Sequence, residues 1–204
     1  MKSIEDTLEM VNKMVKSLSE RDRIYIALAG GYGAIAHGVE RTTVDVDFCL
    51  YADIIHEKGT REFITLLEDV LPNGIEIKFV EGSKVMDEPS KHDVIFLYDK
   101  SGQYPRIDII IARYKWELEG IRMAKPLEDI PFPVLPKPYL IAMKLKAGSL
   151  KDDYDVVEIY SLLTEDEKKK THELTRLIHR DKRLAELLRP RRPEREDEDI
   201  DQIL

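Results

Sequence analysis

The segment that most constrains the fold of this chain is residues 24–51, where an apolar run ends in two glycines and is followed by alternating apolar and acidic residues. Successive side chains of a β-strand point to opposite faces. In a strand through this alternation, Asp45 and Asp47 would share one face, roughly 6.5–7 Å apart. The opposite face would carry Val44, Val46 and Phe48. Two carboxylates on one face repel each other, so we expect a cation between them, and a divalent metal holding a phosphate fits best.

A third carboxylate extends this pattern. Residues 106–111 read as a second strand, with isoleucine at alternate positions on one face and Asp108 on the other. Neighbouring strands lie about 4.8 Å apart, so Asp108 could join Asp45 and Asp47 in one cluster. The sequence therefore predicts a metal site made of Asp45, Asp47 and Asp108.

These residues resemble the signature of the nucleotidyltransferases of the DNA polymerase β superfamily. That signature is Gly-Gly or Gly-Ser after an apolar residue, then Asp-x-Asp between apolar residues, then an Asp on a later strand. The spacing between Gly31 and Asp45 is near the long end for the superfamily. Arg41 and Thr43 add a match to the Arg-x-Thr-x-Asp-x-Asp pattern of the minimal and abortive-infection types. The resemblance covers roughly residues 24–163.

The resemblance implies an enzyme that transfers a nucleoside monophosphate from an NTP, with ATP favoured, to an acceptor and releases pyrophosphate. It implies Mg²⁺ or Mn²⁺ held by Asp45 and Asp47, with Asp108 binding a second metal or taking the acceptor's proton. The expected nucleotide-binding residues are Gly30, Gly31, Tyr32, Arg41, Thr43 and Lys144.

Lys144 is selected because it interrupts the apolar arc of a predicted helix at residues 139–148, whereas Lys146 falls on the far side. A lysine on a packing face needs an anionic partner or a wet cleft. Asp152 could orient Lys144 or serve the N-terminus of the next helix, and the sequence leaves both open. Lys144 and Asp155 also match a pattern common in the abortive-infection enzymes, although an arginine usual near residues 148–150 is absent here.

Two other interpretations compete for the same segment. Gly31-Tyr32-Gly33 begins a G-x-G-x-x-A pattern after a strand, which is typical of dinucleotide binding. That fold expects one acidic residue near the end of the next strand, whereas this chain has two Asp residues within the strand. Alternatively, the acidic strand could be an exposed edge strand with solvated carboxylates.

The expected fold class is α/β (α+β), with a mixed β-sheet flanked by helices and a C-terminal helical domain. We expect a nucleotidyltransferase domain at residues 1–130, including an amphipathic helix at 3–19, and a helical domain at 131–189. Five prolines within residues 126–138 predict an extended connector. The charged, proline-broken residues 190–204 predict a disordered tail.

The composition of the chain bears on the acceptor, the cellular compartment and the partner. The net charge of −8 and the lack of an aromatic-rich tract disfavour nucleic acid, so a protein or small-molecule acceptor is preferred over tRNA. The single cysteine, Cys49, indicates a reducing cytoplasm, and no apolar run is long enough to span a membrane. A toxin or antitoxin protein is also expected as a partner. The alternatives are an antitoxin or regulatory binding protein with the same fold, or a tRNA-modifying toxin.

Overall fold

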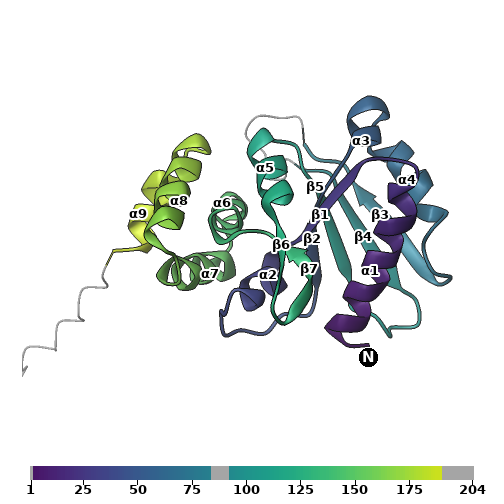
Figure 1. The fold of residues 1–204 in the computed structure, drawn as a ribbon, viewed down its shortest axis with the longest axis horizontal. Coiled ribbons are helices and arrows are strands. Elements are labelled where there is room, and N and C mark those ends of the chain that lie inside the picture. Colours follow the sequence, from purple (N-terminus) through teal and green to yellow (C-terminus); the bar gives the residue numbers. More distant parts are fainter. Residues whose placement is uncertain (1, 84–91, 190–204) are drawn as a thin grey trace, which may run out of the picture.

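A mixed seven-stranded sheet forms the centre of the protein, and helices cover both of its faces (Figure 1). The computed structural model describes residues 2–83 and 92–189. The strand order is β3-β4-β5-β2-β1-β7-β6. Strands β2 and β5 run parallel, as do β1 and β7, while the other neighbours are antiparallel. This arrangement confirms the predicted fold class.

The strands are β1 (Ile24–Leu28), β2 (Val46–Ala52), β3 (Ile75–Val80), β4 (Val94–Asp99), β5 (Ile107–Ile111), β6 (Lys125–Leu127) and β7 (Ile130–Val134). The helices in the described ranges are α1 (Ile4–Ser19), α2 (Gly30–Ala36), α3 (Asp53–Lys58), α4 (Thr60–Glu68), α5 (Lys115–Met123), α6 (Lys137–Ala147), α7 (Leu150–Ser161), α8 (Glu165–Leu177) and α9 (Asp181–Leu187). No helix in these ranges has the length and apolar character needed to cross a bilayer.

Helices α1 and α4 cover one face of the sheet. Helix α1 begins at a capping box in which Ser3 accepts from the backbone of Asp6 and the Asp6 side chain accepts from Ser3. Its apolar stripe packs against the sheet through Leu8, Val11, Met14 and Leu18. The amphipathic helix predicted at residues 3–19 is therefore present, because its helical period matches the core-facing stripe.

The opposite face of the sheet carries a second buried cluster, which continues into the C-terminal helices. Small strand residues such as Ala27 and Cys49 leave room for Tyr139 and Leu140 of α6. The same cluster extends to Leu174 of α8 and Leu184 of α9. The C-terminal helices thus share one core with the sheet. The division into domains at residues 1–130 and 131–189 stays a prediction, and the tail predicted at 190–204 lies outside the described residues.

The proline-rich segment 126–138 is not a free connector, because most of it forms strands β6 and β7 with a turn between them and its last two residues begin α6. Strands β6 and β7 pair with each other through an irregular register, and Leu28 of β1 pairs with Val134 of β7. The N–H of Leu135 then donates to the carbonyl of Leu28 at 3.0 Å. Proline is tolerated in such a short, irregular pair near a sheet edge because few ladder hydrogen bonds are lost. A partner strand distant in sequence cannot be seen in the local pattern.

Candidate active site

The turn from β1 into α2 brings two glycines against the acidic segment. Gly30 has a positive φ of 53°, and a Cβ placed there would lie 1.9 Å from Oδ2 of Asp47. A Cβ on Gly31 would lie 2.7 Å from Oγ1 of Thr43. The Gly31 N–H donates weakly to Oδ2 of Asp47 at 3.4 Å. Glycine is thus required at both positions for the backbone to approach the carboxylate strand.

The predicted acidic residues converge at the start of two neighbouring strands. Asp47 of β2 lies directly opposite Asp108 of β5 in the parallel register. Asp45 comes one residue before β2, where Arg106 joins it to Asp108. The strand does not extend to Val44, which is 79% exposed, so the expectation that Val44 shares the buried face is wrong. Strand β1, the antiparallel partner of β2, ends at Leu28 opposite Phe48, so the ladder between the two strands stops there.

The acidic residues are incompletely neutralised. Burial and, to a smaller extent, the charge of Asp108 raise the pKa of Asp47 to about 6, against the opposing effects of the Gly31 N–H and Lys144. Burial also raises the pKa of Asp108, against the effect of Arg106. No ion pair among the described residues involves Asp47. Such a site favours an added cation.

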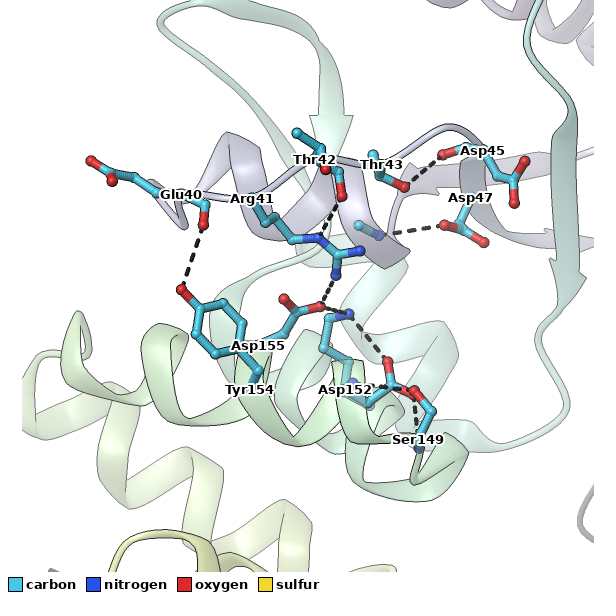
Figure 2. A network of polar contacts seen from close by, with 12 residues as sticks. Glu40, Arg41, Thr42, Thr43, Asp45, Asp47, Ser149, Asp152, Tyr154 and Asp155 are labelled. Carbon is cyan, nitrogen blue, oxygen red and sulfur yellow. Dashed lines mark hydrogen bonds and ion pairs between the residues drawn. The ribbon is translucent and has the colours of Figure 1, made fainter. Parts of the chain in front are cut away.

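Two basic residues meet a buried carboxylate on the other side of the site. Lys144 of α6 is 5% exposed, and its Nζ lies 2.5 Å from Oδ2 of Asp155 and 3.3 Å from Oδ1 of Asp152. Arg41 pairs with the same oxygen of Asp155, as Figure 2 shows. Asp152 also accepts from the backbone N–H of Ser149 at 3.1 Å, completing a capping box for α7. Asp152 therefore does both things that the sequence left open.

A cavity of about 470 Å³ separates these acidic and basic groups. Asp45 and Asp47 lie on one wall and Asp152 and Ser149 on the opposite wall (Figure 2). Of the predicted site residues, the lining includes Gly30, Gly31, Arg41, Thr43, Asp45, Asp47 and Lys144. Its apolar part is formed by Val44, Ile110, Leu140, Met143 and Ala147. The volume is in the range of small-molecule sites.

The two remaining predicted residues, Asp108 and Tyr32, do not line the cavity. Asp108 is 8% exposed and reaches the site through its contact with Arg106. Tyr32 is half-buried and packs against the core cluster that contains α1. The structure therefore brings all the predicted residues together except Tyr32.

The sheet topology excludes the two competing interpretations, a dinucleotide-binding unit and an exposed edge strand. Strands β1 and β2 are antiparallel, whereas a dinucleotide-binding unit requires parallel strands joined by a crossover helix. Strand β2 is also not an edge strand, because it lies between β5 and β1. Its carboxylates are therefore held inside the fold, next to the glycine turn.

Comparison with known families decides the class of the protein. The family model described as nucleotidyl transferase AbiEii toxin, type IV toxin–antitoxin system, matches residues 17–204. The chain belongs to the AbiEii nucleotidyltransferase family. This confirms the predicted enzyme class and its link to toxin–antitoxin systems, and the match is longer than the resemblance seen in the sequence. A sequence search among curated proteins found no match.

Solved structures share the AbiEii-family fold at low sequence identity. The antibiotic-resistance factor ANT(2'')-Ia is 14% identical with a TM-score of 0.50, covering 90% of this chain and 96% of its own. The lincosamide antibiotic adenylyltransferase LnuA is 16% identical with a TM-score of 0.51, covering 80% of this chain and 100% of its own. These similarities support the fold.

Sequence reasoning missed Arg106 as a site residue of this AbiEii-family protein. Its Nε lies 2.7 Å from Oδ1 of Asp108, and its Nη2 lies 2.9 Å from Oδ2 of Asp108 and 2.5 Å from Oδ2 of Asp45. The signal was available, because residues two apart on a strand share a face. In the strand predicted at residues 106–111, an arginine two positions before the third Asp shares its face, although β5 itself begins at Ile107.

Asp155 matches the family pattern in the sequence, but the sequence analysis did not predict it as a site residue. It is fully buried, and its Oδ1 has no hydrogen-bond partner among the residues that the structure describes. Its Oδ2 holds both Arg41 and Lys144. Lys146, expected on the exposed side of α6, lies instead over the ring of Tyr114 at 3.6 Å. The far side of α6 is therefore packed.

The side chains at the site fit a hard divalent cation by chemistry. Carboxylate oxygens are the ligands that Mg²⁺ prefers, and Asp45 and Asp47 both line the cavity. As the side chains stand, the described ranges contain no group of three His, Cys, Asp or Glu residues placed to hold a metal. Arg106 engages oxygens of two of the three predicted ligands.

Proposed function

We propose that this AbiEii-family enzyme transfers a nucleoside monophosphate from an NTP, preferably ATP, to an acceptor nucleophile with release of pyrophosphate. The observation that carries the proposal is one cavity lined by the carboxylates Asp45 and Asp47 and by the cations Arg41 and Lys144. A triphosphate with its metal needs both kinds of charge: acidic groups for the metal and basic groups for the phosphate oxygens.

The chain's own residues divide this work by position. Asp45, Asp47 and Asp108 would hold Mg²⁺ or Mn²⁺, which would neutralise charge on the triphosphate when bound. Lys144 would donate to phosphate oxygens while Asp155 fixes its position. Gly30 and Gly31 have no side chains of their own, which would let phosphate oxygens approach their backbone beside Asp47 and Thr43. Arg41 and Thr43 would contact the nucleotide from the loop before β2.

We propose a protein or a small molecule as the acceptor. The formal charge of −8 disfavours a broad nucleic-acid surface, and LnuA, which shares the fold, is described as a lincosamide antibiotic adenylyltransferase bound to lincomycin. The toxin–antitoxin link of the family supports an antitoxin protein as partner. The buried free thiol of Cys49 is consistent with a reducing cytoplasm.

The test is transfer of label from α-labelled ATP in a whole lysate and on purified tRNA, with and without Mg²⁺. We expect Mg²⁺-dependent label on a protein or small molecule, lowered about 10³-fold or more by Asp45→Ala or Asp47→Ala. Asp69→Ala is the matched control, because Asp69 pairs with Arg21 on the surface away from the cavity. Activity of both site variants within tenfold of wild type would reject the proposal. Strong labelling of tRNA that weakens steeply with salt would reject the acceptor class.

A further inference from the structure

Arg106 occupies the place where the predicted metal site should have its cation. Its guanidinium donates to both oxygens of Asp108 and to Oδ2 of Asp45. These carboxylates are part of the proposed metal site, yet each already has a charge-assisted hydrogen bond. Asp47 is the acidic residue that Arg106 does not contact among the bonds of the described residues.

The guanidinium of Arg106 makes strong hydrogen bonds but stays partly exposed to solvent. A fork of two N–H groups on one carboxylate is a strong, directional contact. The side chain nevertheless remains 37% exposed, and its guanidinium carbon lies 5.6 Å from the centre of the Phe96 ring. It can therefore leave the carboxylates without becoming a buried, unpaired charge. The guanidinium is already within cation–π range of this ring in its present position.

A divalent cation and this guanidinium exclude each other. Arg106 already engages both oxygens of Asp108 and one oxygen of Asp45, and two like charges a few ångströms apart repel strongly in a partly buried site. The carboxylates as they stand, with Arg106 between two of them, do not form a three-ligand metal site within residues 2–83 and 92–189. The Arg106 contacts provide a physical reason for that arrangement.

We propose that Arg106 is a built-in counter-ion that closes the metal site in the metal-free enzyme, and that the incoming divalent cation must displace it. This rests on the metal site of the proposed function. The guanidinium stabilises the free protein by neutralising the carboxylates, and it weakens binding of free metal by competing for them. Removing it should therefore tighten metal binding, which is the opposite of what loss of a supporting residue would do.

The experiment measures binding of Mn²⁺ alone to the full chain, from the electron paramagnetic resonance signal of free Mn²⁺. We expect Arg106→Gln to bind Mn²⁺ at least about tenfold more tightly than wild type, with Arg106→Lys in between because it keeps the charge but loses the fork. Arg21→Gln removes an equal charge from a surface pair with Asp69, and should leave the affinity within about twofold. Equal or weaker binding by Arg106→Gln would overturn the proposal.

Asp47→Asn separates this proposal from the one on which it rests. If it abolishes Mn²⁺ binding and Arg106→Gln does not tighten it, the metal site stands and the counter-ion role fails. If wild type and Arg106→Gln both fail to bind Mn²⁺, the metal site and the counter-ion role fail together.

A second measurement uses the unaltered side chain and does not depend on the folding of a glutamine variant. In wild type, the Nε–H of Arg106 donates to Asp108, so it should exchange slowly with water. Saturating Mg²⁺ should release this proton and speed its exchange, as followed by nuclear magnetic resonance, with the signal assigned by its absence in Arg106→Lys. A signal that Mg²⁺ leaves unchanged would overturn the proposal.

Discussion

Asp47 is the residue whose ionisation should be visible in the stability of the metal-free protein. Burial and the charge of Asp108 raise its pKa to about 6. A carboxyl group with a raised pKa costs the folded state nothing below its unfolded pKa, and the cost grows until pH passes the folded pKa. The contribution of Asp47 to the free energy of unfolding should therefore fall between about pH 4 and pH 6 and stay constant above.

Asp47→Asn should remove this penalty. At pH 7 in the presence of a chelator, we expect the free energy of unfolding to rise by up to about 3 kcal/mol, and the gain should vanish near pH 3.5. Urea denaturation at the two pH values measures it. Asp69→Asn, which alters an exposed ion pair, should change stability little at either pH. A variant no more stable than wild type at pH 7 would mean that Asp47 is already neutralised in the folded protein.

Lys144 makes a second prediction at this scale. Lys144→Met should weaken binding of Mg²⁺–ATP by about tenfold or more, because a charged donor to the phosphates is lost. Among the described ion pairs, Lys144→Met leaves Asp155 with Arg41 as its remaining cation, so the variant should be less stable. Binding is therefore measured by calorimetric titration well below the unfolding temperature. Lys137→Met is the control on the same helix, because Lys137 pairs with Glu167 and does not line the cavity. Equal losses from both variants would assign Lys144 a purely structural role.

At the scale of elements, the junction of β1 and α2 sets how closely the backbone meets the carboxylates. Gly30→Ala would place a Cβ 1.9 Å from Oδ2 of Asp47, so Asp47 must move. We expect nucleotide transfer to fall by about 100-fold or more, because a displacement of about 1 Å at a catalytic group has that effect. Gly38→Ala also places a side chain at a positive φ, 96°, but its Cβ meets Leu162 at an ordinary 3.8 Å. Similar activities of Gly30→Ala and Gly38→Ala in the transfer assay would contradict the prediction that the close approach of Gly30 to Asp47 matters for catalysis.

Some strands of the sheet could be predicted from the local sequence, whereas their pairing could not. The alternation around Asp108 identifies a strand, because strand period is a local property. The antiparallel pairing of β1 with β2 and the addition of β7 beside β1 depend on partners distant in sequence. The carboxylate cluster was therefore predictable from its pattern, whereas the bridge from Arg106 to Asp45 required the relative placement of two segments 61 residues apart.

On the scale of the whole molecule, the sheet and the C-terminal helices should fold as one unit. Trp116 of α5 is 6% exposed and belongs to the same buried cluster as Cys49 of β2 and Leu184 of α9. It is the single tryptophan of the chain, so its fluorescence reports on that cluster alone. Because the cluster crosses the predicted boundary near residue 130, loss of the helices should expose sheet residues as well. Urea unfolding followed by Trp116 fluorescence and by circular dichroism should therefore give coincident transitions.

A substitution in the last helix tests this coupling directly. Leu184 is 1% exposed, and Leu184→Ala should lower the free energy of unfolding by about 2–4 kcal/mol through lost burial and the cavity left behind. If the core is shared, both the fluorescence and the circular dichroism transitions move by the same amount, although Leu184 and Trp116 are far apart in sequence. Leu177→Ala in α8 is the matched control, because Leu177 is 61% exposed and its loss should cost less than about 0.5 kcal/mol. A Leu184→Ala protein whose Trp116 transition stays in place while part of the circular dichroism transition moves would mean that the helices unfold separately.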